Sequence, residues 1–138
     1  MQLEVEINLI LHATENEKKI LEKLENVFHI EQKKIQIEEI PGHFNNPILL
    51  ISSKLKKKSA ENFVRVFFSK MKKTDYQEIF DNVEEYVISS GLSLRVSKQK
   101  LISEILTISK EDAIKININT PVYVKNKTKK IYQELMKN

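Results

Sequence analysis

The sequence predicts one α+β domain with a largely antiparallel sheet and helices packed mainly on one face of that sheet. Residues 2–12 alternate between apolar and polar side chains, which is the period of a half-buried strand. Residues 59–73 and 127–136 place apolar residues at helical spacing. The predicted elements follow the order β-α-β-β-α-α-β-(β)-β-α. Short strand connections with helices grouped between them are typical of α+β folds, and 138 residues suit a single domain spanning 1–138.

The first strand and helix follow from alternation and from a helix cap. Within residues 3–11 the odd-numbered positions are apolar and would face the core, whereas the even-numbered positions are mostly polar. Thr14 and Glu17 have the spacing of a capping box, in which both side chains satisfy free backbone N–H groups at the start of a helix. This spacing predicts a helix over residues 15–28 with an apolar inner stripe.

The next two predicted strands flank a turn rich in proline and glycine. Isoleucines indicate a strand over residues 35–40, and the apolar run of 48–55 is typical of a central strand. The chain contains only two glycines and three prolines, and residues 41–47 hold one of the glycines and two of the prolines. That segment is therefore the most tightly specified turn, and we expect positive φ at Gly42.

Two helices are predicted in the middle of the chain. Ser59 has the position of an N-cap for a helix that continues to residue 73. Thr74 and Gln77 form a second capping box, and the helix that follows is acidic on its outer side. The predicted core positions of the two helices are Phe63, Val64, Phe67, Phe68 and Met71, followed by Tyr76, Phe80, Val83 and Val87.

The remaining chain predicts two or three strands and a last helix. Residues 92–96 and 114–118 alternate as strands, residues 105–108 could form a short one, and Pro121 ends the last strand. Residues 119–138 would be a C-terminal helical extension. With helices on one face, the other face of the sheet would be partly polar and would carry Glu4, Glu6, Arg95, Lys115 and Asn117.

Composition excludes several classes of protein. The absence of cysteine excludes disulfides, thiolate metal sites and cysteine nucleophiles, and it fits a reducing compartment. No apolar run approaches the roughly 20 residues of a membrane helix, so we expect a cytoplasmic protein with no membrane partner. Phosphate-binding glycine loops are absent and the three histidines lie far apart in the sequence. We therefore expect no cofactor, no metal and no enzymatic activity.

Basic residues are concentrated in the middle of the chain. Between residues 54 and 73 eight residues are basic and only Glu61 is acidic. This asymmetry suggests a polyanionic partner. The alternative is that lysine is the default surface residue of this protein, because only Arg65 and Arg95 of the 23 basic residues are arginine.

Four segments carry a family resemblance: His12-Ala13-Thr14-Glu15, Gly42-His43-Phe44-Asn45-Asn46-Pro47-Ile48, Leu94-Arg95-Val96-Ser97-Lys98-Gln99 and Asp112-Ala113-Ile114-Lys115-Ile116. Together they resemble an archaeal family of predicted RNA-binding, exosome-subunit-like proteins over about residues 1–118. Three positions depart from the family's pattern, where we expect glycine at Asn45, aspartate at Ser97 and proline at Ala113. The serine at position 97 removes an acidic partner for Lys98 or Arg95.

The resemblance implies RNA binding and a fold similar to that of the large-subunit ribosomal protein that holds the small ribosomal RNA of that subunit. We therefore expect a non-catalytic RNA-binding protein of archaeal RNA processing or ribosome-related metabolism. Few arginines favour contacts to backbone phosphates over readout of bases. The expected RNA-binding residues are Gly42, His43, Asn45, Asn46, Lys54, Lys56, Lys57, Lys58, Arg65, Lys72, Arg95, Lys98 and Gln99, with Lys70 and Lys73 adding charge.

Other readings of the same residues remain open. His43 and Phe44 could be structural parts of the turn rather than RNA contacts. The protein could instead be a protein-interaction subunit, in an RNA-processing complex or as a homodimer, without direct RNA binding. A small hydrolase or nuclease is a third reading, and it would need carboxylates that converge on one pocket.

Overall fold

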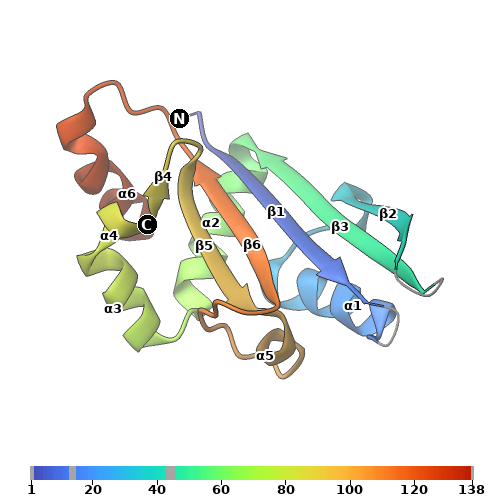
Figure 1. Cartoon of the computed structure of the whole chain (residues 1–138). Helices are drawn as coiled ribbons and strands as arrows, with labels where there is room; N and C mark the ends of the chain where they lie inside the picture. Colours follow the sequence, from blue (N-terminus) through green and yellow to red (C-terminus); the bar gives the residue numbers. More distant parts are fainter. Residues whose placement is uncertain (1, 13–14, 43–45, 138) are drawn as a thin grey trace.

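A computed structural model describes residues 2–12, 15–42 and 46–137 of the chain. It contains a six-stranded sheet in the order β2-β3-β1-β6-β5-β4, with every pair of neighbouring strands antiparallel (Figure 1). The strands are β1 Glu4–Leu11, β2 Ile35–Pro41, β3 Pro47–Lys56, β4 Val87–Ile88, β5 Gly91–Ser97 and β6 Ala113–Asn119. The α+β prediction and the antiparallel sheet are confirmed.

The helices lie on one face of the sheet and at its β4 end (Figure 1). They are α1 Glu17–Phe28, α2 Lys57–Lys70, α3 Lys73–Asp81, α4 Val83–Tyr86, α5 Lys98–Ile102 and α6 Thr128–Lys137, with short 3-10 turns at Gln32–Lys34 and Lys125–Lys127. Among the described residues, no helix has both the length and the apolar character needed to cross a membrane.

The core lies between the sheet and the helices. Alternate residues of β1 are buried and exposed, as the sequence predicts, because β1 pairs with both β3 and β6 at the centre of the sheet. On the helix side an aromatic cluster joins α1 to α2, with the ring of Phe28 5.5 Å from Phe63 and 5.9 Å from Phe67. The predicted core stripe of α2 is thereby confirmed.

Helix α1 begins two residues later than a cap at Thr14 would require. Its N-cap is Asn16, whose side-chain oxygen accepts a hydrogen bond from the Lys19 N–H at 3.1 Å. Asparagine is as good a cap as threonine, so the local chemistry is satisfied by a different residue. Thr14 itself lies outside the described residues. The predicted end at Phe28 is confirmed.

The predicted caps of the next two helices, Ser59 and Thr74, are wrong. For α2 the reason is that strand pairing decides where the helix starts. Strand β3 stays paired with β1 as far as Lys56, and the chain enters α2 directly through Lys57, which has φ of 55° and donates its N–H to Leu3. Ser59 falls inside the first turn, where its hydroxyl accepts a hydrogen bond from Lys34. Thr74 likewise lies within α3, which starts at residue 73.

The expected strand over residues 105–108 is also absent. Leu106 and Ile108 form only isolated bridges, to Met71 and Val96 respectively. The bridge to Met71 ends α2 at Lys70, three residues earlier than predicted. The predicted strands over 92–96 and 114–118 are confirmed as β5 and β6.

Helix α6 packs into the core beside α2 and α4. Its Tyr132, Leu135 and Met136 are buried, and the Tyr76 hydroxyl donates a hydrogen bond to the Met136 carbonyl at 3.0 Å. The Tyr132 oxygen accepts a hydrogen bond from the Thr120 N–H at 3.5 Å, and burial raises the pKa of the Tyr132 phenol. The C-terminal helix therefore completes the hydrophobic core.

Gly42 lacks the positive φ that the turn predicts, since Gly91 is the glycine with left-handed φ in the part of the chain described. The turn needs glycine for another reason. A Cβ at this position would lie 2.2 Å from the Asn46 carbonyl oxygen and 2.9 Å from the Ile48 side chain.

Replacing Gly42 by alanine should therefore lower the free energy of unfolding by about 1–2 kcal/mol, because the turn must open to admit the methyl group. Urea unfolding measures this loss, and Gln36→Ala at an exposed position of β2 is the control. Equal midpoints for the two variants would contradict the steric argument.

Candidate nucleic-acid interface

The face of the sheet opposite the helices is hereafter called the open face. Strand register places its side chains in rows that run across the strands. The first row is Lys56, Glu4 and Asn119; the second is Lys54, Glu6, Asn117 and Ser93; the third is Gln36, Ser52, Asn8, Lys115 and Arg95. The predicted polar face is thus confirmed, and its charges can be compared row by row.

The rows differ in how their basic side chains are neutralised. Lys54 and Lys56 lie directly opposite Glu6 and Glu4, and the Lys56 ammonium is 3.9 Å from the Glu4 carboxylate. In the third row Arg95 lies directly opposite Lys115, and both are exposed. Like charges directly opposite each other repel, so this pair favours an anion that lies between them.

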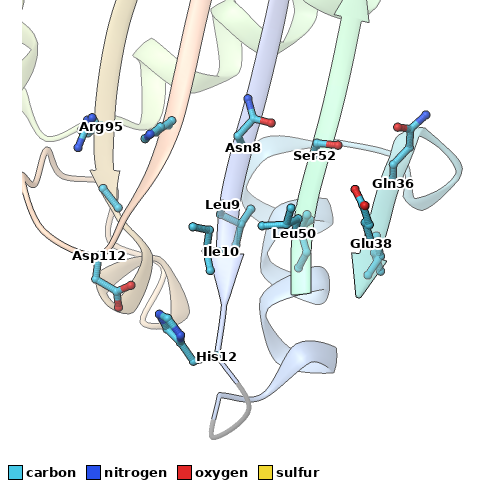
Figure 2. A pocket seen from close by; sticks show the side chains of 14 residues that line it. Asn8, Leu9, Ile10, His12, Gln36, Glu38, Leu50, Ser52, Arg95 and Asp112 are labelled. Carbon is cyan, nitrogen blue, oxygen red and sulfur yellow. The ribbon is translucent and has the colours of Figure 1, made fainter. Parts of the chain in front are cut away.

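Neither Arg95 nor Lys115 makes a side-chain hydrogen bond or ion pair with any described residue. The third row crosses a groove of about 630 Å³ (Figure 2). Arg95, Asn8, Ser52 and Gln36 are seen there at one level of the sheet, on four different strands. The third row therefore brings two cations and three uncharged polar side chains to the groove, and the carboxylates of Glu38 and Asp112 also line it (Figure 2).

The segments that carry the family resemblance meet at one end of the sheet. Neighbouring strands are antiparallel, so the end of β1 lies beside the starts of β3 and β6, and the end of β5 lies beside the start of β6. The turn before β3, the chain after β1, and the segments at residues 97–99 and 112–116 consequently come together. The sequence contains no local signal for this convergence.

Lys98 ties three of these segments together. Its side chain is 2% exposed, and its ammonium donates hydrogen bonds to the Ile10 carbonyl at 2.7 Å and to the Glu15 carboxylate at 2.8 Å. The same nitrogen lies 3.0 Å from a carboxylate oxygen of Asp112. An ammonium has three donors, and three oxygens occupy them. Lys98 is therefore a structural cation here, which replaces its expected role as an RNA contact.

The surroundings of Lys98 also correct the expectation for Ser97. Glu15 and Asp112 supply the acidic partners that an aspartate at position 97 would have offered. The Ser97 hydroxyl instead caps α5, where it accepts a hydrogen bond from the Lys100 N–H at 3.0 Å. Side-chain atoms of His12, Glu15 and Asp112 lie within 4.8 Å of one another, but the Lys98 ammonium already neutralises the two carboxylates. These residues therefore give no argument for a metal.

Gly42 and the lysines at positions 54, 56, 57 and 58 lie at opposite ends of β3, whose ten residues span about 30 Å at the usual rise of a strand. Lys57, Lys58, Arg65, Lys72 and Lys73 lie in the helical layer and are exposed.

Lys70 donates hydrogen bonds to the Val27 and Asn26 carbonyls at 3.1 and 3.5 Å, at the C-terminal end of α1, where a cation is favoured. Asn46 and Gln99 are exposed near the end of the sheet where the segments of the family resemblance come together. His43 and Asn45, with Phe44 between them, lie outside the described residues. The predicted RNA-binding residues therefore do not form one surface.

Sequence reasoning did not single out four residues of the third row as contacts, namely Lys115, Asn8, Ser52 and Gln36. Lys115 and Arg95 each alternate with buried residues of their own strands, which places both on the open face. Their pairing across β5 and β6 depends on register, for which the sequence has no signal.

Comparison with known proteins defines the family. A family model described as RNA binding matches residues 4–120, and the chain belongs to that family. The chain is 30% identical over 126 residues to an RNA-binding protein of Pyrococcus abyssi, covering 86% of this chain and 82% of that protein. It is 27% identical over 142 residues to an uncharacterized protein of Methanocaldococcus jannaschii, covering 97% and 95% of the two chains. The predicted membership of an archaeal RNA-binding family is confirmed.

Solved structures share the fold over nearly the whole chain. A protein of Archaeglobus fulgidus superposes with a TM-score of 0.80 at 22% identity, covering 98% of this chain and 99% of that one. A protein of Sulfolobus solfataricus superposes with a TM-score of 0.78 at 25% identity, covering 96% of each chain. Because both alignments reach the C-terminal region, α6 belongs to the shared architecture.

Proposed function

We propose that this protein is a non-catalytic RNA-binding protein of archaeal RNA processing or ribosome-related metabolism. The observation that carries the proposal is the Arg95–Lys115 pair on the open face. Two cations face each other there without a described acidic partner, at the end of the sheet where the family's segments meet. Membership of an RNA-binding family supports RNA as the polyanion. Exosome-like association remains part of this proposal.

The contact would be made mainly to backbone phosphates. A lysine and an arginine on neighbouring strands, about 5 Å apart, can share one phosphate group. Asn46 and Gln99 would add polar contacts from the same end of the sheet. Lys54 and Lys56 would contribute less, because Glu6 and Glu4 already face them. The exposed cations of α2 and α3 lie in the helical layer and are left out of the proposed RNA surface.

The open edge of the sheet favours the protein-interaction alternative. Strand β2 pairs only with β3 in the sheet order, and Ile37 is 43% exposed on it. An unpaired edge with an exposed apolar side chain can accept a strand from a partner or a second copy. For the nuclease alternative, the two carboxylates that converge are Glu15 and Asp112, and the Lys98 ammonium binds both. That arrangement supports a non-catalytic role.

The proposed contact predicts a measurable salt effect. Changing Arg95 and Lys115 together to glutamine should weaken binding to different RNAs by about tenfold at low salt and should lower the slope of log affinity against log salt by roughly 1.4 to 1.8. Fluorescence anisotropy titrations at two salt concentrations, against a duplex and a single strand, measure both quantities. Folding should be unchanged because both side chains are exposed.

The matched control removes the same charge elsewhere. Lys18 and Lys19 are exposed on α1, on the helix side of the sheet, and changing both to glutamine should leave RNA binding nearly unchanged. An equal loss in both double variants would mean that attraction is diffuse and that the open face holds no site. Wild-type protein that binds neither RNA would overturn the proposed function and favour a protein partner.

A further inference from the structure

The groove on the open face has a floor that is different from its sides. Ile10 and Leu50 lie directly opposite each other on β1 and β3 at the centre of the groove (Figure 2). Ile10 is 49% exposed because it lies on the open face and points away from the helical core. Ala113, at the start of β6, continues the apolar floor toward Arg95. An apolar floor enclosed by polar groups is typical of small-ligand sites, and about 630 Å³ lies within their usual range.

One side of the groove carries the two cations, with the Asp112 carboxylate at the same end, and the other carries uncharged hydrogen-bonding groups together with the Glu38 carboxylate (Figure 2). Lys115 and Arg95 lie on β6 and β5, whereas Asn8, Ser52 and Gln36 lie on β1, β3 and β2. The cations are therefore one to three strand spacings, about 5–15 Å, from the Asn8 amide and the Ser52 hydroxyl. The phosphate, ribose and base of a single nucleotide are arranged over a comparable length.

The polar side chains retain capacity for a ligand. The side-chain amide of Asn8 donates a hydrogen bond to the Glu6 carboxylate at 3.4 Å. Its side-chain oxygen, Oδ1, accepts no hydrogen bond from a described residue. Within the described chain, the side chains of Ser52 and Gln36 also make no hydrogen bond. Amides offer both donors and acceptors, which is what the edge of a nucleobase requires.

We infer that this groove binds one unpaired nucleotide of the RNA. Its phosphate lies between Arg95 and Lys115, its base covers Ile10 and Leu50, and the edge of the base meets Asn8 and Ser52. A paired base inside an A-form helix cannot reach this floor, whereas an unpaired base at an end or in a bulge can be splayed out. The inference rests on the proposed function and assigns it a class of substrate, namely structured RNA with an unpaired nucleotide.

The test compares RNAs that differ by one nucleotide. A blunt two-stranded duplex, the same duplex with one unpaired nucleotide at the 5′ or at the 3′ end, and one with a single-nucleotide bulge are titrated by anisotropy at fixed salt. Burial of the base should make at least one unpaired form bind about fivefold or more tightly than the blunt duplex. Equal affinity for all four RNAs would overturn the inference while leaving RNA binding intact. No binding to any of them would instead count against the proposed function.

Variants of the groove test whether the preference for an unpaired nucleotide depends on its polar side chains. Asn8→Ala with Ser52→Ala should abolish the preference for the RNAs with an unpaired nucleotide and leave affinity for the blunt duplex unchanged. The control is Asn119→Ala, on the same face but in the first row and outside the groove, which should keep the preference. A preference that survives the Asn8 and Ser52 changes would overturn the inference, provided that thermal melting shows both variants folded.

A second measurement does not depend on long RNA. Addition of a nucleoside monophosphate should shift amide NMR resonances of residues 8–10 and 50–52 as well as those near residues 95 and 115. Inorganic phosphate should shift only the latter group. Shifts confined to residues 95 and 115 with both ligands would show a phosphate site without a base site and would contradict the inference.

Discussion

Replacing Lys98 by methionine is expected to lower the free energy of unfolding by about 2–4 kcal/mol. Methionine has a similar length but donates no hydrogen bond, so the Ile10 carbonyl loses its partner. The carboxylates of Glu15 and Asp112, each about 3 Å from the Lys98 ammonium in the wild type, then repel each other without a cation between them. Both carboxylates are partly exposed and can hydrate, which keeps the loss below that of a fully buried pair.

The Lys98 variant has a control on the same helix. Lys100 is exposed on α5 and its side chain makes no hydrogen bond or ion pair with a described residue, so Lys100→Met should change stability by less than about 0.5 kcal/mol. Adding Glu15→Gln to Lys98→Met should recover part of the loss, because it removes one of two repelling charges. Urea unfolding at constant m-value measures all three. Equal midpoints for Lys98→Met and Lys100→Met would show that the buried ammonium does not stabilise the fold.

Lys98 also links stability to the candidate interface. It joins the chain after β1 to the segment before β6, and these segments border the groove. At temperatures where Lys98→Met remains folded, we expect RNA affinity to fall as well, because the ends of β1 and β6 are no longer held together. Lys100→Met should bind RNA as the wild type does.

Gly91→Ala is expected to lower the free energy of unfolding by about 3 kcal/mol or more. Gly91 has φ of +126°, which L side chains rarely adopt, at the start of β5 directly after the turn of residues 89–90. A Cβ there would lie 2.4 Å from the Ile118 carbonyl oxygen and 3.0 Å from the Asn119 Cα. These atoms belong to the paired backbone of β6, which cannot rotate away as a side chain could.

The turn before Gly91 provides the comparison. Ser89 is exposed in that turn, and Ser89→Ala should leave the unfolding midpoint nearly unchanged. If Gly91→Ala does not accumulate as folded protein, Gly91→Asn is a milder replacement, because asparagine tolerates positive φ better than alanine does. A loss smaller than about 1 kcal/mol for Gly91→Ala would contradict both the strain and the overlap.

The sequence by itself determined most of the strands and the inner faces of the helices. Alternation in residues 3–11 and 92–96 and the aromatic stripe of α2 are periodic over several turns or pleats, and the structure confirms them. Periodicity is a local property, because one buried face selects side chains at a fixed spacing along the chain. Family membership was accessible in the same way, since its segments can be matched one after another.

The tertiary structure decided which of these segments meet. Helix boundaries moved where strand pairing extended β3 to Lys56, and the need for positive φ fell on Gly91 instead of Gly42. Lys98 became a buried cation because Glu15 and Asp112, which are distant in sequence, converge on it. The Arg95–Lys115 pair exists only through the register of β5 on β6. Strand order and register depend on contacts between distant parts of the chain, and local periodicity contains no information about either.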